Sequence, residues 1–124
     1  MDKKKKILVV DDEADMQSVI SYRLEVNGYA VSVASDGQEG LSKVKAEKPD
    51  LVLLDLMLPK ITGFELCRML KFDDAYKNLP IIILSALDQQ EDRKKAIESG
   101  ADAYFIKPFD LGLLLTKIDS LLQK

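Results

Sequence analysis

The sequence predicts one α/β domain, in which helices cover both faces of a parallel β-sheet. Short apolar runs rich in β-branched residues alternate with segments of helical periodicity about five times along the chain. Such runs lack polar alternation, which is typical of strands buried on both faces of a parallel sheet. A chain of 124 residues with 47% hydrophobic content fits a single globular domain.

Five of these apolar runs are predicted to be strands, because each is short and is bounded by polar or turn-forming residues. In chain order they are Ile7 to Asp11, Ala30 to Ala34, Leu51 to Asp55, Ile81 to Ser85, and Ala103 to Ile106. The third run is apolar up to its last residue, so Asp55 stands as a lone acid at the end of a buried strand.

The segments that follow each strand are predicted to be helices, and glycine or proline ends several of them. They are Ala14 to Asn27, Gln38 to Glu47, Gly63 to Phe72, Glu91 to Ser99, and Leu111 to Gln123. Gly40 weakens the second helix by roughly 1 kcal/mol relative to alanine. Asp36 and Thr62 are expected to cap the second and third helices.

The charge balance argues against a general attraction to nucleic acid or to anionic membranes. The chain carries 18 basic and 21 acidic residues, a formal charge of -3. The basic run Lys3 to Lys6 has no interleaved arginine or aromatic residue, so residues 1–6 are expected to form a solvated N-terminal tail. The apolar stretch that follows is too short for a signal peptide. We expect a cytoplasmic protein with no membrane insertion and, lacking a helix-turn-helix unit, no direct nucleic acid binding.

The chain has one cysteine and no histidine, which limits the kinds of active site that it can form. Cys67 is the single cysteine, so no intrachain disulfide can form, and its apolar neighbours predict a small buried side chain rather than a reactive thiol. The chain has no histidine. This excludes Ser/His/Asp and Cys/His nucleophile systems, His-ligated zinc and a phosphohistidine carrier.

Polar side chains gather at the carboxyl ends of the predicted strands, where open α/β sheets bind ligands. Asp11 and Asp12 end the first strand, Asp55 the third and Ser85 the fourth, while Lys107 follows the fifth. Three carboxylates brought together repel one another, so a hard divalent cation is the natural counter-charge. Magnesium suits oxygen ligands, with Mn²⁺ as the alternative ion, whereas zinc would favour His or Cys.

Lys107 and Ser85 add a positive charge and a hydroxyl donor, which together suit a dianionic phosphoryl group. On this interpretation an oxygen of Asp55 attacks phosphorus, Asp12 and Asp55 bind the cation, and Asp11 supports the metal shell. The product is an aspartyl phosphate, and no general base is needed because Asp55 is already ionised. The residues alone leave Asp55 open to three roles: metal ligand, structural ion-pair partner or nucleophile.

Six short motifs in order carry a family resemblance. They are Val9 to Glu13, Pro49 to Asp55, Leu58-Pro59 with Gly63, Ser85-Ala86, Gly100 to Tyr104, and Lys107 to Phe109. On these motifs the chain resembles, over essentially all of residues 1–124, a receiver domain of two-component response regulators. No linker follows the last predicted helix, so the expected architecture is a stand-alone receiver of the chemotaxis type.

The resemblance implies a flavodoxin-like (βα)5 fold, a doubly wound five-stranded parallel sheet in the order 2-1-3-4-5. It implies Asp55 as the phosphoacceptor, with a metal site formed by Asp11, Asp12, Asp55 and the main-chain carbonyl of Met57. Lys107 and Ser85 would complete the acceptor site, Ser85 and Tyr104 would form the switch, and a cis peptide would precede Pro108. The phosphodonor would be a sensor histidine kinase, a phosphotransfer protein or a small phosphodonor, and a partner would be regulated at the surface of the fourth helix, fifth strand and fifth helix.

Several positions depart from common patterns in the family. Ala103, Leu113 and Ser120 interrupt the charged pattern by which the transcription-factor branch pairs, which leaves the oligomeric state open. Met57 and Leu87 are apolar and are expected to flank the acyl phosphate. Because apolar groups do not orient an attacking water, we expect slow intrinsic dephosphorylation.

Three other functions compete with that of a receiver. A magnesium phosphohydrolase of the haloacid-dehalogenase type usually has a second aspartate two positions after the nucleophile, where this chain has Met57. A flavin-binding flavodoxin-like domain would need a phosphate loop after the first strand, where Asp11 to Glu13 would repel the cofactor phosphate. A non-phosphorylated pseudo-receiver that acts only as a docking module would not need the complete acceptor set that is present.

Overall fold

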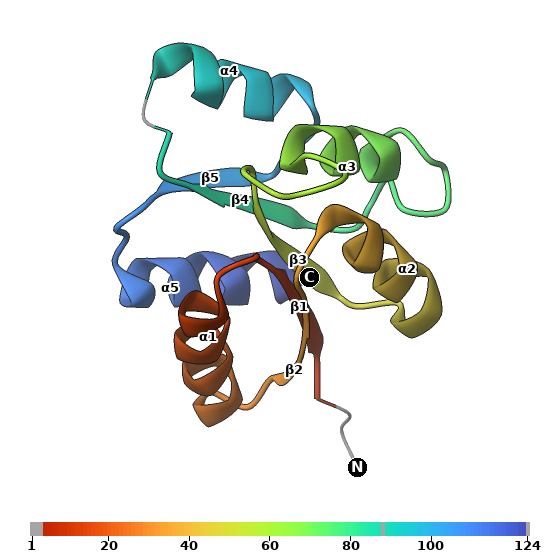
Figure 1. Cartoon of the computed structure of the whole chain (residues 1–124). Coiled ribbons are helices and arrows are strands. Elements are labelled where there is room, and N and C mark those ends of the chain that lie inside the picture. Colours follow the sequence, from red (N-terminus) through yellow and green to blue (C-terminus); the bar gives the residue numbers. More distant parts are fainter. Residues whose placement is uncertain (1–3, 88, 124) are drawn as a thin grey trace.

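A computed structural model of the chain describes residues 4–87 and 89–123. Five parallel strands form one sheet in the order β2-β1-β3-β4-β5, with helices on both faces (Figure 1). The predicted fold class and strand order are therefore confirmed. No described helix is long and apolar enough to cross a membrane.

The strands lie close to their predicted positions. They are β1 (Lys6–Val10), β2 (Ala30–Ala34), β3 (Leu51–Asp55), β4 (Ile81–Ser85) and β5 (Ala103–Ile106). Only β1 differs, since it begins at Lys6, inside the stretch expected to be a tail, and ends before Asp11. The reason is lateral pairing: the Lys6 N–H donates to Asp50 Oδ2 at 2.7 Å, and the Lys5 carbonyl accepts from Ala30 at 2.9 Å.

The helices begin and end within one residue of the predicted positions. They are α1 (Ala14–Val26), α2 (Gly37–Glu47), α3 (Gly63–Lys71), α4 (Gln90–Glu98) and α5 (Leu111–Leu122). The predicted caps are confirmed: Asp36 Oδ1 accepts from the Glu39 N–H at 2.8 Å, and Thr62 forms a capping box with Glu65. Caps of this kind typically contribute about 1 kcal/mol each.

Two apolar cores separate the two faces of the sheet. Helices α2, α3 and α4 cover one face, and α1 and α5 cover the other (Figure 1). Successive strand residues point to opposite faces, so Leu8 packs in the first core and Ile7 in the second. Cys67 is buried in the first core, as predicted, and burial raises the pKa of its thiol. The Lys107–Pro108 peptide is cis, as expected.

The start of α3 is packed directly against the end of β3. The Gly63 N–H donates to the Leu56 carbonyl at 3.1 Å. A Cβ at Gly63 would collide with the carbonyl oxygen of Asp55 and lie 2.6 Å from the Leu56 Cα. Glycine is therefore required here by the close approach of two main-chain segments, and this approach positions the residue at the end of β3.

Candidate functional site

The predicted site residues meet at the carboxyl edge of the sheet. Asp11 and Asp12 follow β1, Asp55 ends β3, Ser85 ends β4 and Lys107 follows β5. These strands are neighbours in the sheet, so residues far apart in the chain are brought to one edge. The edge thus combines three carboxylates, one hydroxyl and one ammonium group.

Asp11, Asp12 and Asp55 form an acidic cluster. One carboxylate oxygen from each lies within 4.8 Å of those of the other two. Asp11 and Asp55 are only 2% and 5% exposed, whereas Asp12 is exposed to solvent. An oxygen-only set of ligands with one open side fits a hard divalent cation such as Mg²⁺, which keeps several waters.

Lys107 supplies the positive charge at this cluster. Its Nζ lies 3.1 Å from Asp11 Oδ2, 3.3 Å from Asp55 Oδ2 and 3.5 Å from Glu13 Oε1. Burial of the ammonium group opposes its protonation, but the charges of Asp55 and Asp11 prevail and hold the pKa of Lys107 above its usual value. Lys107 is therefore a firmly charged group directed at the carboxylate of Asp55.

Asp55 is a carboxylate in an unfavourable setting for its ionised form. Burial is the main cause that raises its pKa above the ordinary aspartate value, and the charge of Asp11 acts in the same direction. The Met57 N–H, 3.1 Å from Asp55 Oδ1, and the ammonium of Lys107 oppose the shift without cancelling it. Additional positive charge beside Asp55 would lower its pKa toward the ordinary aspartate value. The local electrostatics therefore favour a bound cation.

Main-chain hydrogen bonds orient the two buried acids. The Glu13 N–H donates to Asp11 Oδ1 at 2.8 Å, just as the Met57 N–H donates to Asp55 Oδ1. The Oδ2 atoms of both acids are thereby left facing Lys107. The Met57 side chain is 63% exposed and the role of its carbonyl as a metal ligand stays a prediction.

Ser85 and Tyr104, the predicted switch pair, are connected through Leu87. Ser85 is fully buried, and its Oγ accepts from the Leu87 N–H at 3.1 Å. The Tyr104 hydroxyl donates to the Leu87 carbonyl at 2.6 Å, and the ring packs beside the first core. The guanidinium of Arg93 on α4 lies 5.7 Å from the centre of the Tyr104 ring. One continuous set of contacts therefore leads from the acceptor edge to α4.

The sequence did not predict the contacts of three residues at the site. Glu13 belongs to a family motif but has no predicted role in the acceptor site, Leu87 is predicted only to flank the acyl phosphate, and no prediction involves Arg93. The position of Glu13 directly after the acid pair was an available signal. The contacts of Leu87 and Arg93 with Tyr104 have no such signal, because they depend on how the segment after β4 and helix α4 pack beside β5.

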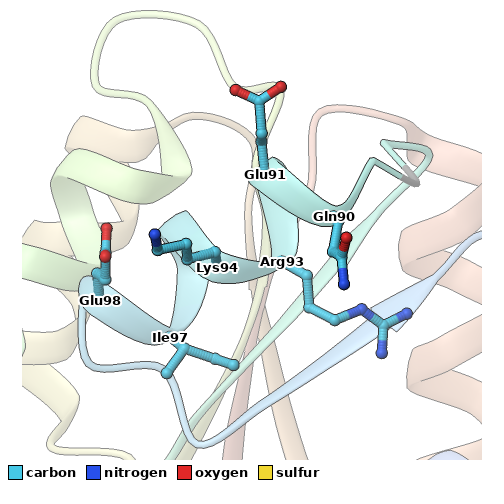
Figure 2. Close-up of a pocket in the computed structure, with 6 residues that line it drawn as sticks. All are labelled: Gln90, Glu91, Arg93, Lys94, Ile97 and Glu98. Atoms are coloured by element: carbon cyan, nitrogen blue, oxygen red, sulfur yellow. The ribbon is translucent and has the colours of Figure 1, made fainter.

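A separate pocket lies on α4, away from the acidic cluster. Figure 2 shows its lining, in which all six labelled side chains come from this helix: Gln90, Glu91, Arg93, Lys94, Ile97 and Glu98. Ile97 is exposed among charged neighbours. Because Arg93 belongs both to this pocket and to the Tyr104 contact, the pocket is physically connected to the switch pair.

Comparisons with known proteins point to one family. Residues 7–119 match the family model described as the response regulator receiver domain. The chain is 43% identical over 120 residues to the alkaline phosphatase synthesis transcriptional regulatory protein PhoP of Bacillus subtilis, covering 97% of this chain and 49% of that protein. It is 40% identical over 119 residues to the DNA-binding dual master transcriptional regulator RpaA of Synechocystis sp., covering 96% and 49%. The chain thus spans about half the length of these curated relatives.

Solved structures give the same result. The receiver domain of the Francisella response regulator 1452 superposes with a TM-score of 0.90 at 34% identity, covering 97% of this chain and 98% of that one. The BeF3-activated DrrB receiver domain superposes with a TM-score of 0.89 at 33% identity, covering 98% and 100%. The chemotaxis response regulator CheY4 of Vibrio cholerae superposes with a TM-score of 0.89 at 31% identity, covering 97% and 100%.

Proposed function

The chain belongs to the response regulator receiver domain family, and from this premise we propose that residues 1–124 form one receiver domain phosphorylated on Asp55. The observation that carries the proposal is the position of Asp55. It lies at the end of β3, beside Asp11 and Asp12 and within 3.3 Å of the Lys107 ammonium. The phosphoryl group would change the surface of α4, β5 and α5 and so regulate a partner.

The acceptor chemistry follows from the groups present. A carboxylate oxygen of Asp55 attacks phosphorus and a new O–P bond forms. The electron pair of the broken bond leaves with the donor atom, which is the imidazole nitrogen of a phosphohistidine or the carboxylate oxygen of acetyl phosphate. Lys107 binds one oxygen of the arriving phosphoryl group and the hydroxyl of Ser85 donates to another. Mg²⁺, when held by Asp11, Asp12, Asp55 and the Met57 carbonyl, would supply the positive charge that offsets the charge of the phosphoryl group. The domain would thus catalyse only its own phosphorylation and dephosphorylation.

The contacts of Leu87 support a route for the signal. Ser85 accepts a hydrogen bond from the main chain of Leu87, and Tyr104 donates to the same residue. Movement of the Ser85 hydroxyl toward a phosphoryl oxygen would therefore displace the residue to which Tyr104 is bound. Arg93 would pass the change to the α4 pocket shown in Figure 2. Such a shift between two populations needs only small differences in contact energy.

The partners are proposed from the family. A sensor histidine kinase or a phosphotransfer protein would be the donor. The names of the relatives describe transcriptional regulators, and those proteins are about twice as long as the matched region. The absence of direct nucleic acid binding by these residues stays a prediction.

The alternative functions are not supported. The position two residues after Asp55 is Met57, whose exposed side chain offers no second carboxylate for a phosphohydrolase. The family match also disfavours a flavin-binding domain, and the acidic cluster with Lys107 beside it disfavours a pseudo-receiver.

The decisive test is mass spectrometry after incubation with acetyl phosphate and Mg²⁺. We expect wild type and Asp74→Asn to gain one phosphoryl group and Asp55→Asn to gain none. Asp74 is a suitable control because its side chain is fully exposed. If the Asp55→Asn variant still gains a phosphoryl group, the acceptor is another residue.

A further inference from the structure

We infer that Glu13 is a positioning residue that competes with the phosphoryl group for the ammonium of Lys107. The inference rests on the proposed phosphorylation of Asp55. In the unphosphorylated protein, the Glu13 carboxylate would hold Lys107 on the α1 side of the site. During phosphorylation Lys107 would exchange this carboxylate for a phosphoryl oxygen.

The geometry distinguishes Glu13 from the other two carboxylates around Lys107. Asp11 and Asp55 are buried, whereas the Glu13 side chain is 65% exposed and reaches Lys107 Nζ at 3.5 Å from outside the cluster. The Glu13 main chain is nevertheless anchored to the cluster, because its N–H donates to Asp11 Oδ1. The backbone is thus held in place while the side chain remains adjustable.

Helix capping does not account for the Glu13 side chain. Glu13 occupies the N-cap position of α1, where a side-chain oxygen commonly accepts from the first turn. Its side chain makes no such bond in the described structure. Its described ion pair is instead the one with Lys107, across the site from α1 to the residue after β5.

The charges predict the direction of the effect. Of the three carboxylates around Lys107, those of Asp11 and Asp55 also belong to the acidic cluster, so a bound cation would compete with Lys107 for them. Glu13 lies outside that set and would continue to attract Lys107. Its exposed carboxylate also adds a negative charge beside Lys107, the cation that a dianionic donor would bind. Removing the carboxylate should therefore improve the use of an anionic phosphodonor, by a modest factor because the pair is largely exposed.

The first experiment compares acetyl phosphate kinetics in Mg²⁺ for wild type, Glu13→Gln and Asp15→Asn. Asp15 is a matched control, since it is an exposed acid in the first turn of the same helix and outside the ion pairs of the described residues. We expect Glu13→Gln to lower the KM for acetyl phosphate about threefold with kcat unchanged, and Asp15→Asn to behave as wild type. An unchanged or higher KM in Glu13→Gln, or the same decrease in Asp15→Asn, would overturn the inference.

The second experiment measures the contact without metal or phosphodonor. A double-mutant cycle on urea unfolding in EDTA combines Glu13→Gln with Lys107→Met, and a second cycle replaces Glu13→Gln by Asp15→Asn. We expect non-additive effects for the Glu13 cycle and additive ones for the Asp15 cycle. Additivity in both would show that Glu13 does not hold Lys107. If wild type incorporates no phosphoryl group at all, the proposed function fails, but this cycle still decides whether the contact exists.

Discussion

Tyr104 and Leu87 are joined by a hydrogen bond of 2.6 Å, in which the tyrosine hydroxyl donates to the main-chain carbonyl. The same leucine donates its N–H to Ser85 Oγ at the end of β4. Leu87 therefore links a strand-end hydroxyl at the acceptor edge to an aromatic side chain on β5. On the proposed route, this bond would couple phosphorylation of Asp55 to the surface of α4.

Tyr104→Phe removes the hydroxyl and keeps the ring. We expect a loss of about 1 kcal/mol in the free energy of unfolding, typical of one hydrogen bond. Phosphorylation of Asp55 should persist, because the hydroxyl bonds to Leu87 rather than to the acidic cluster. NMR shift changes of α4 amides on adding BeF3⁻ and Mg²⁺ should become smaller. Tyr22→Phe on the exposed face of α1 is the control, and an undiminished α4 response in Tyr104→Phe would contradict the proposed route.

Asp55→Asn is expected to stabilise the fold at pH 7. The pKa of Asp55 is raised in the folded state, mainly by burial, so its favourable contribution is complete at low pH and is lost as pH rises through the folded pKa. At neutral pH the ionised carboxylate is therefore a cost that asparagine removes, while Lys107 keeps Asp11 and Glu13 as partners. Urea unfolding should show a higher midpoint for the variant at pH 7.

Two measurements complete that test. The advantage of Asp55→Asn should shrink as the pH falls to about 4 and below, where aspartate becomes protonated. Added Mg²⁺ should stabilise wild type more than the variant, because the variant lacks one carboxylate of the cluster. A variant less stable than wild type at pH 7 would mean that the Lys107 contact outweighs the cost of burial.

Met57→Asn is expected to accelerate hydrolysis of the aspartyl phosphate, by roughly tenfold if the amide orients an attacking water. Met57 is exposed and apolar beside Asp55, so no side-chain group at this position now binds water. Phosphate release from the phosphorylated domain gives the rate directly. Met69→Asn, also exposed but on α3, serves as the control. An unchanged or slower rate in Met57→Asn would be evidence against the expected slow intrinsic hydrolysis.

Gly63→Ala should damage both stability and phosphorylation. The new Cβ would collide with the main chain of Asp55 and Leu56, which cannot move aside as a flexible side chain can. We expect a loss of about 1–3 kcal/mol on urea unfolding, together with slower phosphorylation by acetyl phosphate. Gly112→Ala in α5 is the matched control, because its Cβ would approach only the side-chain oxygen of Asp110. Normal stability in Gly63→Ala would show that the end of β3 can shift freely.

Much of the fold was predictable because its signals are local. The apolar runs that become β2, β3, β4 and β5 were identified with their observed bounds, and the caps at Asp36 and Thr62 follow from residue type and position. The predicted start of β1 is wrong, because pairing with β2 and with the segment before β3 extends the strand beyond its apolar residues. Strand order came only through the family resemblance, since it depends on crossovers that leave no local pattern.

The candidate site could likewise be predicted only in part. Asp11, Asp12, Asp55, Ser85 and Lys107 could be identified from the sequence, because a polar residue ending a buried apolar strand is conspicuous and parallel strands end at one edge. The packing of the chain alone determined that Glu13 reaches Lys107 and that Leu87 joins Ser85 to Tyr104. These contacts form between side chains and main-chain atoms on different strands and helices, so their existence depends on three-dimensional geometry to within an ångström, which no run of residues encodes locally.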